Sequence, residues 1–182
     1  MIAAALVALS AIACELALPI HESGDGGDDA SPTGNLLQNP GFEQGSIGCG
    51  AAWTTQSGSV TIEISDASHS GAQSCFVCAT TSSGINQHLK TSFDAGVNFL
   101  GSVWVAPGGD AATAEARLFV TFHLLDASPQ DYINVSSSGS TAWTQVSKPV
   151  TSTGLVTSID YYVELLGDGG CVLVDDAVLV AQ

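Results

Sequence analysis

The chain has 182 residues, which is room for one folded domain of ordinary size, and 45% of them are apolar. Acidic residues number 18 and basic residues 3, for a formal net charge of −15. Because phosphate backbones and anionic lipids are bound by clusters of Lys and Arg, this balance excludes nucleic acid as a direct partner and electrostatic docking onto a membrane. The apolar content argues against disorder of the chain as a whole.

The first 13 residues, MIAAALVALSAIA, are uncharged and apolar, and they end at Cys14. A helix of this length rises about 20 Å, short of the roughly 30 Å apolar core of a bilayer, so residues 1–13 predict an export signal. Ala11-Ile12-Ala13-Cys14 resembles a relaxed bacterial lipobox, which would place a lipid on Cys14. The alternative is a plain secretory signal. We expect an exported protein, at the cell surface or outer membrane if lipidated and secreted otherwise, that meets the membrane only through this anchor.

Residues 14–34 form a predicted acidic tether. From Glu22 onward they are rich in Gly, Asp, Ser and Pro and show no apolar period, which is typical of a flexible linker. The tether holds five of the 18 acidic residues, so the predicted domain, residues 35–182, keeps 13 acidic residues against 3 basic ones. We expect this domain to be monomeric.

From Asn35 onward, short apolar or alternating runs are separated by Gly, Ser, Asp and Pro. Only Ala111–Arg117 leans toward helix, and no run shows an apolar stripe of period 3.6 with caps. The pattern therefore predicts an all-β sandwich of two antiparallel sheets. The predicted strands are Val60–Ser65, Ser74–Thr80, Asn86–Lys90, Asn98–Ala106, Glu115–Leu125, Asp131–Val135, Thr141–Val150, Ser158–Leu166 and Cys171–Val180.

Four cysteines remain if Cys14 is lipidated, and an even number in an exported chain favours two disulfide bonds. Cys75 and Cys78 have the C-x-x-C spacing of zinc and redox sites. However, they lie in a strand-like run, where residues three apart point to opposite faces, and no second C-x-x-C or His pair completes a zinc tetrahedron. Opposite faces favour two separate bridges. The sequence leaves the pairing among Cys49, Cys75, Cys78 and Cys171 open.

Six blocks of the domain follow the order of a known family. The opening block, Asn35–Glu43, reads NLLQNPGFE, and Trp53 follows it. The later blocks are His69–Val77, Gly84–Gln87, Phe99–Val105, Ala142–Thr144 and Val174–Leu179. Together they resemble the CenC-like carbohydrate-binding modules, grouped with families four, nine and twenty-two. The resemblance implies a jelly-roll β-sandwich, often with a structural calcium and a concave glycan-binding face.

The resemblance also implies where a calcium ion would bind. Calcium takes six to eight oxygen ligands from carboxylates and main-chain carbonyls. Carried over residue by residue, the ligands are the carbonyl of Gly41, the carboxylate of Glu43, side-chain and main-chain oxygens of Asp66, the carbonyl of His69 and the carboxylate of Asp175.

Strand alternation predicts that Asp175 shares the apolar face of Leu173, Ala177 and Leu179. A carboxylate there is costly unless it is paired or metal-bound, and the chain has few basic partners. The alternative is that Asp175 caps backbone amides at a strand bend, with Glu43 and Asp66 as ordinary solvated acids.

Glycan recognition would need rings that stack on sugars and polar groups that read hydroxyls. Trp53, Trp104 and Trp143 are expected to be structural, since large aromatic side chains dominate cores. The loop Thr80–Ile85, where the family carries a stacking ring, has none. The predicted ligand-binding residues are Gln87, His123, Tyr132 and Asn134, with Tyr161 and Tyr162 as further candidates for the concave face.

The sequence contains no G-x-S-x-G elbow, no H-E-x-x-H and no phosphate loop, so we predict that the protein is not an enzyme. The predicted function is non-catalytic glycan or polysaccharide binding by a surface-anchored or secreted module with a structural calcium. The alternative is a structural or adhesion lipoprotein that keeps the fold without binding sugar.

Overall fold

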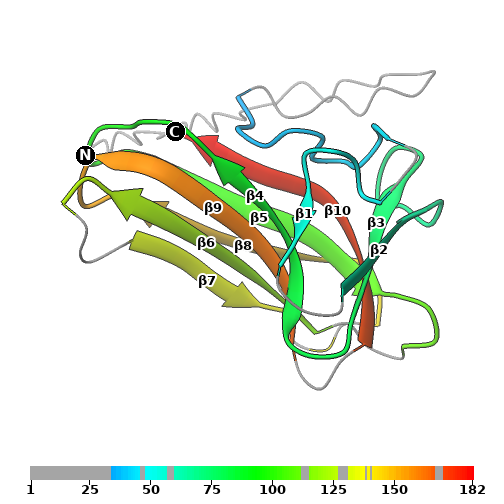
Figure 1. Ribbon diagram of the computed structural model, residues 1–182. Helices are drawn as coiled ribbons and strands as arrows, with labels where there is room; N and C mark the ends of the chain where they lie inside the picture. The colour runs from blue at the N-terminus through cyan, green and yellow to red at the C-terminus, as the bar shows by residue number, and fades with distance from the viewer. Residues whose placement is uncertain are drawn as a thin grey trace, which may run out of the picture.

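The computed structural model describes residues 34–45, 48–56, 60–111, 115–126, 131–137, 139, 141–166 and 170–182. The predicted export signal, Cys14 and the tether up to residue 33 lie outside these residues. Within the described ranges, no helix is long and apolar enough to cross a membrane. Ten strands form two antiparallel sheets of five strands each, arranged as two layers (Figure 1). The all-β sandwich predicted from the sequence is confirmed.

We name each sheet after its central strand. The β9 sheet has the order β1-β4-β9-β6-β7 and the β10 sheet has the order β2-β3-β10-β5-β8. In the β9 sheet the strands are β1 (Thr54–Thr55), β4 (Ser83–Leu89), β9 (Val156–Leu165), β6 (Ala116–Leu124) and β7 (Asp131–Ser136). In the β10 sheet they are β2 (Val60–Ser65), β3 (Ser74–Ala79), β10 (Gly170–Ala181), β5 (Asn98–Pro107) and β8 (Thr144–Thr151).

All nine predicted strands are present, with ends displaced by three residues at most. The tenth, β1, is only two residues long, too short to show any period in the sequence. The stretch that leans toward helix ends in β6, which begins at Ala116. At Ala116 and Arg117, pairing within the sheet therefore overrides the local helix preference, and residues 112–114 of this run lie outside the described residues.

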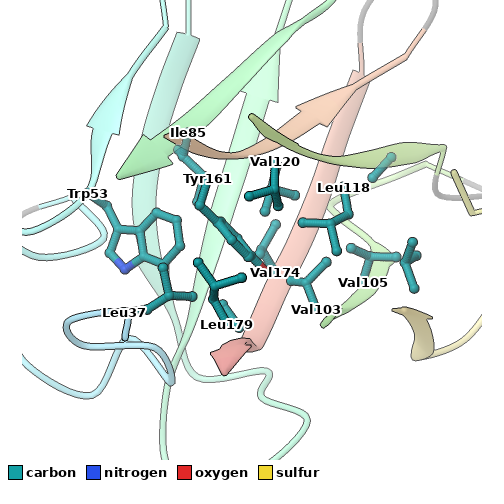
Figure 2. Close-up of a cluster of buried hydrophobic side chains, with 14 of the residues drawn as sticks. Leu37, Trp53, Ile85, Val103, Val105, Leu118, Val120, Tyr161, Val174 and Leu179 are labelled. Atoms are coloured by element: carbon teal, nitrogen blue, oxygen red, sulfur yellow. The ribbon is translucent and has the colours of Figure 1, made fainter. Parts of the chain in front are cut away.

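The inner faces of the two sheets meet in an apolar core (Figure 2). The largest fully buried side chain is Tyr161 of β9, whose hydroxyl donates a hydrogen bond to the carbonyl of Ser102 on β5 at 2.6 Å. Burial raises the pKa of this phenol well above its ordinary value. Trp53 packs against Tyr161 and Phe42, at ring-centroid distances of 6.0 and 5.0 Å, so Trp53 belongs to the core. Each fully buried large apolar side chain contributes about 1.5–3 kcal/mol to folding.

Both cysteines of the C-x-x-C motif form disulfide bonds. Cys75 faces the core and is bonded to Cys49, whereas Cys78 points to the other face of β3 and is bonded to Cys171 on β10. The prediction of two separate bridges is confirmed, and the structure decides the pairing. Cys78–Cys171 joins two strands of the β10 sheet, whereas Cys49–Cys75 ties the loop before β1 to β3 of the β10 sheet.

Candidate functional site

The candidate site is the outer face of the β9 sheet, the face that points away from the core. On β9, the buried residues Ile159, Tyr161 and Val163 alternate with residues that point outward. The strand register then fixes which outward side chains are neighbours across β4, β9, β6 and β7. These side chains are Asn86, His88, Arg117, Phe119, Thr121, His123, Tyr132, Asn134, Asp160, Tyr162 and Glu164.

Three aromatic rings lie next to one another on this face. Phe119 of β6 stacks at 6.1 Å from Tyr162 of β9, with 29° between the ring planes, and lies 6.0 Å from Tyr132 of β7. Tyr132 is 56% exposed. The guanidinium of Arg117 lies 5.4 Å from the centre of the Phe119 ring. The rings thus form a continuous platform over three strands, which we call the aromatic row.

A charged pair borders the aromatic row on one side. Arg117 donates two hydrogen bonds to Oε2 of Glu164, one of them from Nε at 2.8 Å, and Gln56 donates to Oε1 at 3.1 Å. Because both carboxylate oxygens are held, the side chain of Glu164 is oriented before any ligand arrives. A pocket opens beside it, lined by Gln56, Ser82, Ser83, Asn86, Tyr162 and Glu164.

A second charged cluster lies on the other side of the row. Nδ1 of His88 is 2.6 Å from Oδ1 of Asp160, and Nε2 of His123 is 2.6 Å from Oδ2 of the same carboxylate. Burial raises the pKa of Asp160, but hydrogen bonds from the two histidines outweigh it, so the net pKa lies below its ordinary value. The pKa of the neighbouring Tyr162 phenol is raised, chiefly by burial and then by the charge of Asp160.

The structure divides the predicted ligand-binding residues between two faces. His123, Tyr132, Asn134 and Tyr162 lie on the outer face of the β9 sheet. Gln87 points inward and is only 4% exposed. Its amide exchanges hydrogen bonds with the backbone of Gln38, accepting at 3.0 Å and donating at 2.6 Å. Gln87 therefore fastens the opening loop to β4 and is not part of the outer face, and Tyr161 lies in the core.

Sequence reasoning overlooked several members of the outer face: Asn86, His88, Arg117, Phe119, Asp160 and Glu164. Strand alternation could have identified most of them. Phe119 has the same parity as His123 on β6, and Asp160 and Glu164 have the same parity as Tyr162 on β9.

The residues predicted to bind calcium gather around the loop that follows β2. Oδ2 of Asp175 accepts hydrogen bonds from the amides of His69 and Ser70, at 2.8 and 3.2 Å, and Oδ1 accepts from the amide of Asp176 at 2.8 Å. Oε1 of Glu43 accepts from the amides of residues 72 and 73, at 2.8 and 2.9 Å. The two carboxylates thus hold the two ends of one segment, residues 69–73.

The placement of Asp175 differs from the alternation predicted for it. A bulge between Asp175 and Val178 shifts the register of β10, and Asp176 in the bulge has a positive φ of 44°. Consequently Asp175 shares the face of Leu173 but lies on the opposite face from Ala177 and Leu179, so the prediction is wrong for those two neighbours. The carboxylate is nevertheless fully buried, because residues 69–73 cover it.

Burial, together with the neighbouring charge of Asp176, raises the pKa of Asp175 to about 7, despite the three backbone amides that favour the ionised form. Within the described ranges, no group of three or more His, Cys, Asp or Glu side chains is arranged to hold a metal. Asp66 is exposed. A cation here would therefore depend on the main-chain oxygens as well as on Asp175 and Glu43, and calcium stays a prediction.

The two remaining tryptophans lie beside this loop. The ring of His69 stacks on Trp104 at 3.8 Å, with 16° between the planes, and lies edge-on to Trp143 at 5.7 Å. His69 is also bonded through Nδ1 to Asp176 at 2.6 Å. Trp104 and Trp143 thus support the loop that covers the β10 sheet.

Residues 34–169 match a family described as a carbohydrate-binding domain, and the chain belongs to this family. Its members are binding modules, in agreement with the prediction that the chain is not an enzyme. No curated protein is similar enough in sequence to match the chain.

Solved structures support the fold. The CBM22-1 xylan-binding domain of Xyn10C from Paenibacillus barcinonensis has a TM-score of 0.62 at 18% identity, over 87% of this chain and 97% of that one. A structure of TmCBM61 in complex with β-1,4-galactotriose has a TM-score of 0.52 at 19% identity, over 81% of this chain and 99% of that one. The enzymatically active domain of tailspike protein 4 from bacteriophage CBA120 has a TM-score of 0.64 at 12% identity over 81% of this chain, which spans only 21% of the tailspike chain.

Proposed function

We propose that the protein binds a polysaccharide chain along the outer face of the β9 sheet, with the aromatic row as its stacking platform. The observation that carries this proposal is the contact of Phe119 with both Tyr162 and Tyr132 on a solvent-facing sheet surface. Aromatic rings that are not needed for the core are unusual on such a surface, where they mark binding sites.

The polar neighbours of the row supply hydrogen-bonding groups for sugar hydroxyls. Asn86 lies beside Tyr162 and Asn134 lies beside Phe119, in the direction across the strands. Neighbouring strands are about 4.8 Å apart, so the line from Asn86 to Asn134 spans roughly 14 Å over four strands. A ligand lying across the strands would contact polar groups at both ends of this line and rings in its middle.

The similar structures suggest which polymers to test first. One of them is a xylan-binding domain and another holds β-1,4-galactotriose. Native gel electrophoresis with xylan or β-1,4-galactan in the gel would measure retention directly. We expect retention on at least one polymer, and a strong loss of retention in the double variant Phe119→Ala/Tyr162→Ala. If the wild-type protein is retained on no glycan, the proposal is wrong and the adhesion alternative is favoured.

We further propose that a calcium ion stabilises the corner where Glu43 and Asp175 hold residues 69–73. The support is a fully buried carboxylate with a raised pKa that accepts hydrogen bonds from three backbone amides. We expect added calcium to raise the melting temperature and EDTA to reverse the rise. An unchanged melting temperature would contradict the calcium proposal without affecting the glycan proposal.

We also propose export with lipidation of Cys14, on the sequence pattern alone. Mass spectrometry of the mature protein would identify its first residue and any attached lipid. An unmodified N-terminus near residue 13 would favour the secreted alternative.

A further inference from the structure

Two of the three histidines in the predicted domain converge on one carboxylate at the edge of the aromatic row. Asp160 on β9 lies between His88 on β4 and His123 on β6, and each imidazole nitrogen is 2.6 Å from a different carboxylate oxygen. The side chains of His88 and His123 are 46% and 33% exposed, so a ligand on this face would meet them. We call these three residues the histidine cluster.

The other titratable groups that face the histidine cluster come from all the strands around it. On β9 they are Tyr162, next to Asp160, and Glu164 beyond it. Glu164 is paired with Arg117 of β6. Tyr132 of β7 lies across Thr121 from Asp160. Lys90 follows the end of β4 and lines the same pocket as His88.

The charge of the face therefore depends on the two histidines. Glu164 and Arg117 offset each other, so a change in the charge of this face comes from the histidine cluster. With both imidazoles neutral the cluster carries the single negative charge of Asp160, and with both protonated it carries a single positive charge. Histidine ordinarily changes charge between about pH 5 and 8. In a domain with 13 acidic residues and 3 basic ones, a local reversal of sign at the ligand face is a large change.

We infer that the histidine cluster tunes the preference of this face for glycans that carry carboxylate groups: acidic glycans bind more tightly when His88 and His123 are protonated than when both are neutral, whereas the affinity for uncharged glycans is the same in either state. This inference rests on the proposed glycan-binding face. The interaction acts over a few ångströms at a solvated surface, where each ion pair changes affinity only a few-fold, so we expect about a fivefold effect in total.

The test compares matched polymers. Native affinity gels would contain xylan or β-1,4-galactan, each uncharged or carboxymethylated, at about pH 5 and about pH 8, on either side of the ordinary histidine range. For each polymer, the affinity at about pH 5 is divided by the affinity at about pH 8. The readout is this ratio for the carboxymethylated polymer divided by the same ratio for the uncharged polymer. For the wild-type protein we expect this quotient to be about five, and to fall toward one as salt is added, because salt screens surface charges.

The quotient should fall to one in the double variant His88→Gln/His123→Gln, whose amides still donate to Asp160 without ever carrying charge. Lys148→Gln removes a basic residue from β8 of the other sheet and should leave the quotient unchanged. Thermal melting would establish that the variants are folded, and the single variant His88→Gln, at the more exposed position, should lower the quotient by itself.

The outcomes separate the two proposals. Wild-type retention with a quotient of one, or a quotient that persists in the double variant, overturns the role of the histidine cluster and leaves glycan binding intact. No retention on any polymer at either pH overturns the glycan-binding face, and the inference falls with it.

Discussion

The two sheets of the sandwich use their outward faces differently. On the β10 sheet the Cys78–Cys171 disulfide, the loop of residues 69–73 and the stacking of His69 on Trp104 occupy the outer face with internal contacts. On the β9 sheet the charged side chains pair with one another across strands, and the aromatic row keeps Tyr132 exposed and Phe119 and Tyr162 partly exposed to solvent. One sheet is thus stabilised by cross-links and capping, which leaves the other free to present a binding surface.

The largest effect should come from the disulfide that joins β3 to β10. The double variant Cys78→Ser/Cys171→Ser opens a loop of 93 residues, and for loops of this length the expected loss is about 4–5 kcal/mol of unfolding free energy. Denaturant titration measures it. Glycan retention by the folded fraction should persist, and its loss would show that the two sheets are not functionally separate.

The second-largest loss of stability should come from Asp175, whose carboxylate caps backbone amides. Asp175→Ala leaves the amides of residues 69, 70 and 176 without their acceptor, at an expected cost of about 2–4 kcal/mol. Melting in EDTA measures this cost apart from any metal. Asp66→Ala is the matched control and should melt like the wild-type protein in EDTA, since Asp66 is exposed. Equal melting of the two variants would contradict the capping role.

A smaller effect, and one on binding, is expected from the aromatic row. Phe119→Ala removes the ring that contacts both tyrosines, and the affinity for the retained polymer should fall roughly tenfold. Trp143→Ala removes a ring that precedes β8 and contacts His69 beside the other sheet, and it should leave affinity unchanged in the folded protein. Isothermal titration calorimetry on soluble oligosaccharides gives both values. Equal losses would show that the β9 sheet is not the distinctive binding face.

The smallest effect on stability should follow Tyr132→Ala. The side chain is 56% exposed, so the free energy of unfolding should change by about 0.5 kcal/mol or less. Affinity should still fall about threefold, because one end of the platform is lost. A stability loss comparable to that of Asp175→Ala would indicate that Tyr132 serves packing instead of binding.

Local patterns in the sequence were sufficient to predict the fold class, the positions of most strands and the membership of Cys75 and Cys78 in two different disulfide bonds. These properties depend on the alternation of side chains along a strand, which any short segment displays by itself. The same alternation, applied fully, would also have assigned Phe119 to the face of His123 on β6 and Glu164 to the face of Tyr162 on β9. The opening motif together with the later blocks was sufficient to identify the family.

Only the tertiary structure decided which strands are neighbours, and hence that Asp160 meets both histidines and that Phe119 lies between two tyrosines. It also decided the disulfide pairing, the inward direction of Gln87 and the bulge that moves Asp175 to the other face of β10. The physical reason is that these contacts join residues dozens of positions apart. Their energies depend on strand register and sheet order, which no local pattern of residues encodes.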